Sequence, residues 1–278
     1  MSLYITSINS GSNGNCYYVG NQREAVLIDA GVSCRITEER MKRLGLSLNK
    51  VKAIFITHEH TDHTRGVEVL SRRHQIPVYL TPSTYEKSRL GIAEDFVKPV
   101  KAYIPVSIGD LSVTAFPKKH DAVDPHSFTV TYEGITIGVF TDIGVACDDV
   151  KRNFRMCSAA FLEANYDEEM LEKGLYPQYL KTRIRGDHGH LSNRQALDLF
   201  LAHKSPFMTH LLLSHLSQDN NNPDLVLKLF RKHSTGTHIS IASRHEESEV
   251  YCISANPLEN GEGRGAIIAP FPVQMTLF

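Results

Sequence analysis

The sequence predicts a layered α/β fold in a single domain. Short apolar runs alternate with amphipathic segments along the 278 residues, and an apolar content of 41% is ample for a continuous core. No long low-complexity linker interrupts this alternation. Residues 1–254 are therefore expected to form one domain, and the Gly- and Pro-containing residues 255–278 to form a linker and tail.

The first elements are expected to be a strand meander that leads into a buried strand. Apolar patterning predicts strands at 4–8, 16–19 and 25–29, with a Gly-rich turn at 10–15. A helix at about 35–44 should then precede a strand at 51–57, and a second helix should cover 64–73.

The later predicted strands each end at a histidine or an acid. These strands are 111–116 before His120, 135–140 before Asp142, 159–162 before Glu163, and 207–213 before His215. A capping box from Ser192 to Gln195 opens a helix and places His190 just before its N-terminus. The recurrence of such residues at strand ends and helix starts predicts one shared site.

Composition narrows the classes of function. No apolar stretch reaches membrane-spanning length and residues 1–10 lack signal-peptide order, so a cytoplasmic protein without a membrane partner is expected. The five cysteines are scattered and form no CxxC pair, which argues against a disulfide framework or a thiolate zinc site. Because the net charge is −1, nucleic-acid binding would need a local basic surface.

The most informative stretch follows the predicted 51–57 strand and indicates metal chemistry. Dinuclear hydrolase sites hold two cations roughly 3.5–4 Å apart, which requires about seven ligands. We expect His58 and His60 to bind one ion, and Asp62 and His63 the other. The set would be completed by His120, Asp142 and His215, with Asp142 as the bridging carboxylate. Zinc suits the imidazole-rich position best, while the carboxylates would also accept manganese or iron.

This pattern resembles the metallo-β-lactamase superfamily, whose HxHxDH signature is matched residue for residue. Asp29 stands in the Leu-Ile-Asp-Ala-Gly position of the family's first motif, and we expect it to hold the ligand loop by hydrogen bonds rather than to bind metal. The resemblance covers nearly the whole chain. It implies a four-layered αββα sandwich, two mixed sheets flanked by helices, with the metals at one edge.

Residues around the ligands favour phosphodiester chemistry within this superfamily. Asp142 stands where many lactamases carry a thiolate, and His60 where diiron oxidoreductases carry an acid. Three late segments, 162–165, 189–192 and 214–217, resemble motifs of nucleases such as ribonuclease Z. Four segments, 11–15, 120–125, 162–165 and 176–193, give the chain its greatest resemblance to the YycJ-like (WalJ) branch. Members of this branch are regarded as 5′ to 3′ DNA exonucleases.

Phosphodiester hydrolysis needs a nucleophile, neutralised charge at phosphorus, and a proton or positive charge for the leaving oxygen. We expect Asp62 to orient the nucleophile, and His190 to serve the leaving oxygen with Glu163 fixing its tautomer. Otherwise His190 is a helix-entry residue and Glu163 a buried ion-pair partner. The cations beside these motifs would either bind phosphate or form a solvated face. They are Lys118, Lys119, Lys181, Arg183 and Arg185.

The final residues, Gln274-Met275-Thr276-Leu277-Phe278, resemble the motif by which bacterial DNA enzymes bind the sliding clamp. The alternative is a last edge strand or a tail packed on the domain. The leading hypothesis is a dinuclear-metal-dependent phosphodiesterase acting on nucleic acid, a 5′ to 3′ exonuclease on DNA, with RNA as the other polymer. The alternatives are a hydrolase of thioesters, lactones or cyclic phosphodiesters, and a non-catalytic, metal-stabilised adaptor of the replication machinery.

Overall fold

Two seven-stranded sheets form the centre of the protein in the computed structural model, which describes residues 1–255. The first sheet has the order β14-β1-β2-β3-β4-β5-β6, and the second β13-β12-β11-β10-β9-β8-β7. Strands of the first sheet are β1 (Ser2–Asn9), β2 (Cys16–Gly20), β3 (Ala25–Ile28), β4 (Val51–Phe55), β5 (Val78–Leu80), β6 (Val97–Pro99) and β14 (Tyr251–Ser254). Strands of the second are β7 (Val106–Ile108), β8 (Leu111–Pro117), β9 (His126–Tyr132), β10 (Ile135–Phe140), β11 (Ala159–Glu163), β12 (His210–Ser214) and β13 (His238–Ile241).

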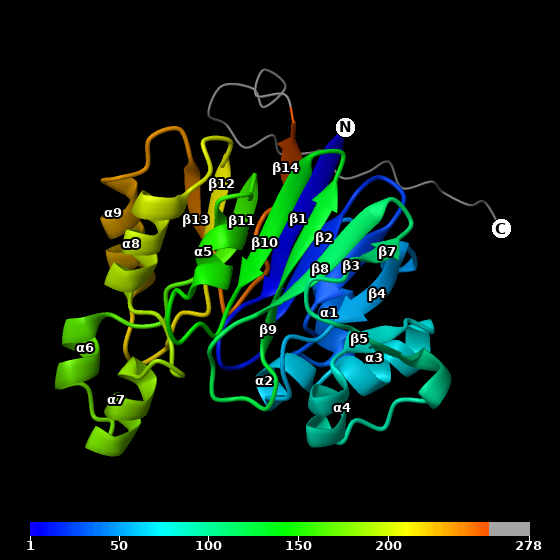
Figure 1. The fold of residues 1–278 in the computed structure, drawn as a ribbon, viewed down its shortest axis with the longest axis horizontal. Coiled ribbons are helices and arrows are strands. Elements are labelled where there is room, and N and C mark those ends of the chain that lie inside the picture. The colour runs from blue at the N-terminus through cyan, green and yellow to red at the C-terminus, as the bar shows by residue number, and fades with distance from the viewer. Residues whose placement is uncertain (256–278) are drawn as a thin grey trace.

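Helices cover the outer faces of both sheets, as Figure 1 shows. On the side of the first sheet lie α1 (Cys34–Arg43), α2 (Thr61–Thr64), α3 (Val67–His74) and α4 (Pro82–Ser88). On the side of the second lie α5 (Asp148–Phe154), α8 (Asn193–His203) and α9 (Pro223–Arg231). The remaining pair, α6 (Glu168–Lys173) and α7 (Gln178–Arg185), projects at the lower left of Figure 1. The predicted four-layered αββα architecture is confirmed.

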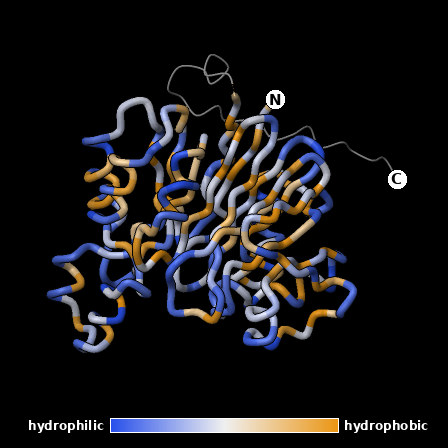
Figure 2. The backbone as a smooth tube through the Cα atoms, in the orientation of Figure 1, coloured by the Kyte–Doolittle hydropathy of each residue, from blue (hydrophilic) through white to orange (hydrophobic). Residues whose placement is uncertain are grey.

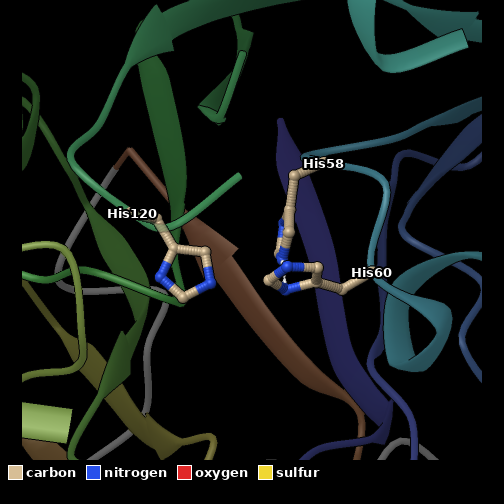
Figure 3. Close-up of side chains that lie close together, drawn as sticks. All are labelled: His58, His60 and His120. Carbon is tan, nitrogen blue, oxygen red and sulfur yellow. Dashed lines mark hydrogen bonds between the residues drawn. The ribbon is translucent and has the colours of Figure 1, made fainter. Parts of the chain in front are cut away.

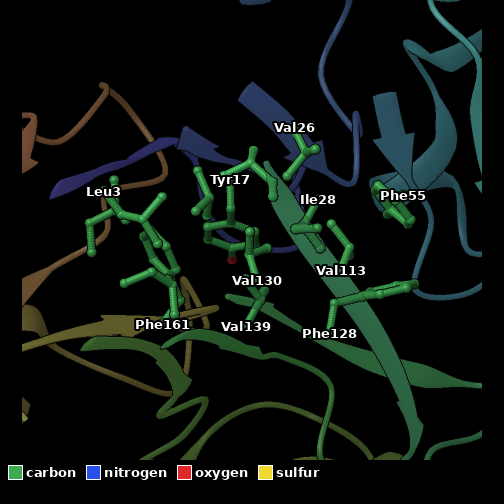
Figure 4. Close-up of a cluster of buried hydrophobic side chains, with 14 of the residues drawn as sticks. Leu3, Tyr17, Val26, Ile28, Phe55, Val113, Phe128, Val130, Val139 and Phe161 are labelled. Atoms are coloured by element: carbon green, nitrogen blue, oxygen red, sulfur yellow. The ribbon is translucent and has the colours of Figure 1, made fainter. Parts of the chain in front are cut away.

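The main core lies between the two sheets. Strand side chains from both sheets meet there, and Figure 4 shows this packing for residues of β1, β2, β3, β4, β8, β9, β10 and β11. The ring of Tyr17 lies 4.8 Å from that of Phe161, and Phe55 meets Phe128 edge-on at 5.4 Å. Smaller cores fill the space between each sheet and its helices. Figure 2 shows hydrophobic residues along the strands, and alternating with hydrophilic ones along the helices.

Both sheets are mixed, and their parallel parts determine where the site forms. The pairs β3·β4, β4·β5 and β5·β6 are parallel in the first sheet, as are β10·β11, β11·β12 and β12·β13 in the second. Parallel neighbours end at the same edge of a sheet, so the residues that follow β3, β4, β10, β11 and β12 gather there.

The structure corrects several predicted elements. The helix expected at 64–73 is broken into α2 and α3 at Gly66, whose N–H donates to the carbonyl of Ala30 at 2.8 Å. A β-carbon at Gly66 would collide with the Val32 carbonyl, so close backbone approach requires glycine there. Strand β12 starts at His210, and Phe207, which was placed in that strand, is 75% exposed. Helices α4 to α7 were not predicted.

The predicted boundary at residue 254 stays a prediction, because the tail beyond residue 255 lies outside the described residues. Within the described part of the chain, no helix has the length and apolarity needed to span a bilayer.

Candidate metal centre

The site lies at the edge where strands of both sheets end, and three of those ends share an unusual backbone. Asp29 after β3, Asp142 after β10 and His215 after β12 have φ values of 63°, 53° and 55°. This left-handed region disfavours residues with a β-carbon. The conformation turns the chain sharply as each strand ends, and the site retains it despite its energetic cost.

Three histidines form the first donor group, shown in Figure 3. His58 and His60 come from the loop after β4, and His120 comes from the loop after β8. One nitrogen each of His58, His60 and His120 lies within 4.8 Å of the others. His58 Nε2 and His60 Nδ1 are 3.0 Å apart, and the His120 ring lies 4.9 Å from the His58 ring. Loops from the two sheets thus converge on one point.

A second donor group lies beside the first and consists of Asp62, His63 and His215. Asp62 Oδ2 is 3.5 Å from His63 Nε2 and 3.7 Å from His215 Nε2. Asp142 reaches both groups, with Oδ2 3.1 Å from His63 Nε2 and Oδ1 3.7 Å from His120 Nε2. The structure therefore brings all seven predicted ligands together, with Asp142 in the bridging position.

The donor set fits two divalent cations. Three of its buried atoms make no hydrogen bond: His120 Nε2, His215 Nε2 and one carboxylate oxygen of Asp142. Buried polar atoms without partners cost free energy, and all three belong to the two donor groups or to Asp142, which reaches both. Imidazole and carboxylate ligands suit zinc, manganese and iron.

The acids and imidazoles of the donor set shift one another's pKa values. Burial disfavours the charged form of His215, but Asp142, Asp62 and Glu163 outweigh burial and raise its pKa to about 10. For Asp142, burial is outweighed by His215 and His63, which hold its pKa well below the usual range. Ligand imidazoles must lose these protons when a metal binds, so metal binding should release protons.

Asp29 and Asn15 support the ligands from behind. Asp29 Oδ2 accepts from His63 Nδ1 at 2.7 Å, and its other oxygen accepts the Thr57 N–H at 2.8 Å. Asn15 Nδ2 lies 3.3 Å from Asp62 Oδ2 and 3.1 Å from His63 Nε2. The Asn15 N–H also donates to the Asp62 carbonyl at 2.7 Å. Sequence reasoning assigned Asn15 no role, although its position at the end of the Gly-rich turn was a usable signal.

Two more residues support the site: Lys118, which was expected to contact phosphate, and Asn165, to which no role was assigned. Lys118 is buried, its Nζ donates to the Thr141 carbonyl at 2.7 Å, and burial lowers its pKa. Asn165 Nδ2 donates to the His215 carbonyl at 2.8 Å. Each contact anchors the backbone at or beside a left-handed ligand residue. Only the neighbouring motifs marked these two positions in the sequence.

His190 and Glu163 form a hydrogen-bonded pair beside the donor groups. His190 Nδ1 lies 2.8 Å from Glu163 Oε1, and the same oxygen lies 3.0 Å from His215 Nδ1. Glu163 Oε2 accepts the Ile143 N–H at 2.7 Å. Burial opposes the charge of Glu163, but His190 and His215 hold its pKa at about 2. The His190 side chain is 22% exposed, so it opens to solvent while Glu163 does not.

The cations predicted to bind substrate are placed differently from one another. Lys119 is exposed. Lys181 is buried, and its Nζ donates to the Glu172 carbonyl at 2.5 Å. Arg183 pairs with Asp121 at 2.5 Å, and Arg185 pairs with the Glu172 carboxylate. Three of these four, like Lys118, are thus engaged within the protein. The proposed clamp-binding residues Gln274, Met275, Leu277 and Phe278 lie outside the described residues.

Comparisons with known proteins agree with this geometry. The family model of the β-lactamase superfamily domain matches residues 24–215. The chain is 35% identical to exodeoxyribonuclease YycJ of Bacillus anthracis over 228 residues, 81% of this chain and 86% of that protein. It is 31% identical to exodeoxyribonuclease WalJ of Streptococcus pneumoniae, over 78% of this chain and 82% of that one.

The fold is also similar to a solved structure, the metallo-β-lactamase fold protein YhfI of Bacillus subtilis. The TM-score is 0.70 at 16% identity, with 91% of this chain and all of that chain covered (100%). Family model, relatives and fold thus agree, and the chain belongs to the β-lactamase superfamily, in the branch that contains exodeoxyribonucleases YycJ and WalJ.

Proposed function

We propose that this protein is a two-metal phosphodiesterase that degrades DNA as a 5′ to 3′ exonuclease. The observation that carries the proposal is the His190–Glu163 pair, held at 2.8 Å beside a donor set suited to two cations. Relatives whose names are exodeoxyribonuclease YycJ and WalJ support DNA as the polymer. Direction rests on the family resemblance alone.

Two divalent cations would supply a water of lowered pKa and neutralise charge at the phosphorus atom. They would be held by His58, His60 and His120 on one side, by Asp62, His63 and His215 on the other, and by Asp142 between them. Zinc fits this set best, with manganese or iron as alternatives. Asp62, the least buried of the acids here, would orient the attacking water through its free oxygen lone pairs.

His190 would serve the leaving oxygen. Because its Nδ1 contacts the Glu163 carboxylate, Nδ1 carries the proton and the ring is held in one orientation. Protonated His190 would present its Nε2–H to the oxygen that leaves phosphorus. Glu163 acts only through His190 and His215, so it is a positioning residue. A thioester or lactone has less need of such a cationic donor, which favours phosphodiesters over those substrates.

The direct test compares His190→Ala with His188→Ala, an exposed histidine two residues away. End-labelled DNA and RNA are incubated with metal-loaded protein, beside bis(p-nitrophenyl) phosphate and a thioester. We expect mononucleotide release from DNA, starting at the 5′ end, to fall about 10²- to 10⁴-fold in His190→Ala. His188→Ala should behave as wild type, and Asp62→Ala should be inactive.

Other outcomes of this test assign a different function. Faster cleavage of RNA than of DNA would make RNA the substrate. Hydrolysis of the thioester alone would make the protein a small-molecule hydrolase. Inactivity on every substrate with two metals bound would favour the adaptor role. Metal analysis of each variant must accompany the assay, since loss of a cation would also abolish turnover.

We further propose that residues 274–278 bind the replication sliding clamp. The support is the sequence Gln-Met-Thr-Leu-Phe alone, whose Leu-Phe pair suits a hydrophobic groove. A DNA substrate and this partner together imply a cytoplasmic location. Surface plasmon resonance on immobilised clamp should show saturable binding that Leu277→Ala/Phe278→Ala abolishes, and equal weak signals from both proteins would refute the idea.

A further inference from the structure

Two arginines on the Gly-rich-loop side of the metal centre have no acidic partner within the described residues. Arg65 follows α2, which carries Asp62 and His63, and Arg244 follows β13. Neither forms an ion pair there, whereas Arg183 and Arg185 on α7 do. Besides Lys119, which precedes His120, Arg65 and Arg244 are therefore basic residues near the site without an ion pair among the described residues.

Asn13, in the Gly-rich loop, connects the two arginines. Its Nδ2 donates to the Arg244 carbonyl at 2.8 Å, and its own carbonyl accepts weakly from Arg65 Nη1 at 3.4 Å. A β-carbon added at Gly11 would lie 3.4 Å from Arg244 Cβ and 3.6 Å from the Leu216 carbonyl. Arg244 therefore packs where the Gly-rich loop meets the segment after His215.

Arg244 is held firmly and carries an unused donor. The Ser243 carbonyl accepts the Ser10 N–H at 3.1 Å, and Ser10 Oγ accepts the His215 N–H at 2.8 Å. Nη1 of Arg244 is buried and makes no hydrogen bond. A buried guanidinium donor without a partner is costly, and an anion would relieve that cost.

Two carboxylates on neighbouring segments are already engaged. Glu247 pairs with Arg43 at 2.6 Å, and Asp219 accepts from the Tyr176 hydroxyl at 2.8 Å. Burial and Asp219 raise the pKa of Tyr176, and the charge of Arg244 opposes that rise, so Arg244 lies within electrostatic reach of the loop before α7.

We propose that Arg65 and Arg244 form a subsite for the phosphates of the nucleic-acid backbone, with Asn13 positioning both. This inference rests on the proposed nuclease function and adds the place where the polymer lies. Guanidinium groups bind phosphate oxygens in pairs of charge-assisted hydrogen bonds, and they do so without regard to base sequence. Arg65 follows the helix that carries Asp62, and Ser243, next to Arg244, is linked through Ser10 to His215. A phosphate bound by these arginines would therefore adjoin the phosphate that reacts at the metal centre.

The test uses metal-loaded full-length protein with Arg65→Gln, Arg244→Gln and Arg244→Lys. Arg72→Gln, an exposed arginine on α3, removes the same charge away from the site. Each variant is assayed for DNA cleavage, for turnover of bis(p-nitrophenyl) phosphate, and for the salt dependence of DNA binding by fluorescence anisotropy. The small diester reaches the metals without needing a second phosphate, so it reports on chemistry alone.

We expect each Gln variant to raise KM for DNA about tenfold and to lower the salt slope by about 0.7–0.9. Turnover of the small diester should stay within about twofold. Arg244→Lys should keep the salt slope and recover part of the affinity, because charge remains while the paired geometry is lost.

DNA kinetics of Arg65→Gln and Arg244→Gln equal to those of Arg72→Gln would overturn the subsite and leave the nuclease function standing. An equal loss on DNA and on the small diester would indicate structural damage to the metal centre and would also overturn it. If the wild type hydrolyses the small diester but neither cleaves nor binds DNA, the nuclease proposal itself fails and the subsite loses its substrate.

Discussion

Individual residues at the strand ends carry most of the site's geometry. Asp29, Asp142 and His215 adopt a left-handed backbone that an L-residue avoids unless its surroundings impose it. The surroundings do so through buried hydrogen bonds: Thr57 donates to Asp29, and Asn165 donates to the His215 carbonyl. The predicted ligands Asp142 and His215 are thus held in place by the fold itself, which would favour metal affinity because less ordering is needed on binding.

Asn15 is expected to control metal affinity although it is not among the seven ligands. Its amide contacts both Asp62 and His63, so Asn15→Ala should weaken zinc binding about 10- to 100-fold by freeing the Asp62 carboxylate. Calorimetric titration of metal-free protein measures this, with the exposed Asn49→Ala as the control. Unchanged affinity in Asn15→Ala would show that the backbone alone positions Asp62.

Among the elements, α8 has the strongest local start signal and places His190 just before it. Ser192 Oγ accepts from the Gln195 N–H at 3.1 Å and donates to Glu168 Oε1 at 3.0 Å, and Gln195 closes the capping box. Ser192→Ala should lower the free energy of unfolding by about 1–2 kcal/mol. Ser33→Ala removes an exposed helix cap, whose Oγ accepts from the Ile36 N–H at 3.3 Å, and should lower the free energy of unfolding by only about 0.5 kcal/mol. Urea denaturation measures both values. Equal losses of stability in Ser192→Ala and Ser33→Ala would show that burial of the cap does not matter.

A histidine pair where β12 and β13 begin should make stability depend on pH. Burial and the charge of His238 lower the pKa of His210 from 6.5 to about 4. As the pH falls, His210 therefore becomes protonated in the unfolded chain before it does so in the folded protein. Its effect on the free energy of unfolding is nil above pH 6.5, and below that pH it lowers this free energy progressively towards pH 4. Between pH 6.5 and pH 4, the free energy of unfolding of the wild type should fall by about 2 kcal/mol more than that of His210→Gln.

Urea denaturation at several pH values measures this difference between wild type and His210→Gln. The exposed His233→Gln serves as the control and should follow the wild type at every pH. A difference between wild type and His210→Gln that stays constant from pH 7 to pH 4 would refute the predicted pKa shift.

At the scale of the whole molecule, the metal centre joins the two sheets. In the first sheet, the loops after β3 and β4 supply Asp29 and the HxHxDH residues. In the second sheet, the loops after β8, β10 and β12 supply the other predicted ligands, which are His120, Asp142 and His215. The sheets share one core, and the loops that carry the predicted ligands meet at this edge. Metal should therefore stabilise the fold as well as enable the chemistry.

Zinc is expected to raise the thermal midpoint of unfolding of the metal-free protein. At 100 times the dissociation constant, the gain is about 2.7 kcal/mol, or roughly 5–10 °C for a domain of this size. Differential scanning calorimetry with and without zinc measures it. His203→Ala, remote from the site on α8, should show the full shift, and His215→Ala should lose most of it. A shift that persists in His215→Ala would place the stabilising zinc elsewhere.

Local signals in the sequence were enough to predict the α/β class and the strands β1 to β4, β8 and β10 to β12, because apolar periodicity marks strands. The HxHxDH spacing and the strand ends predicted the seven metal ligands, which the structure brings together. Tertiary structure alone decided that Gly66 breaks a helix, since the break comes from the approach of a distant backbone. It also decided which cations remain unpaired, because the partners of Arg183 and Arg185 come from other segments. The support given by Asn15, Lys118 and Asn165 likewise depends on contacts between segments far apart in the chain, which no local pattern encodes.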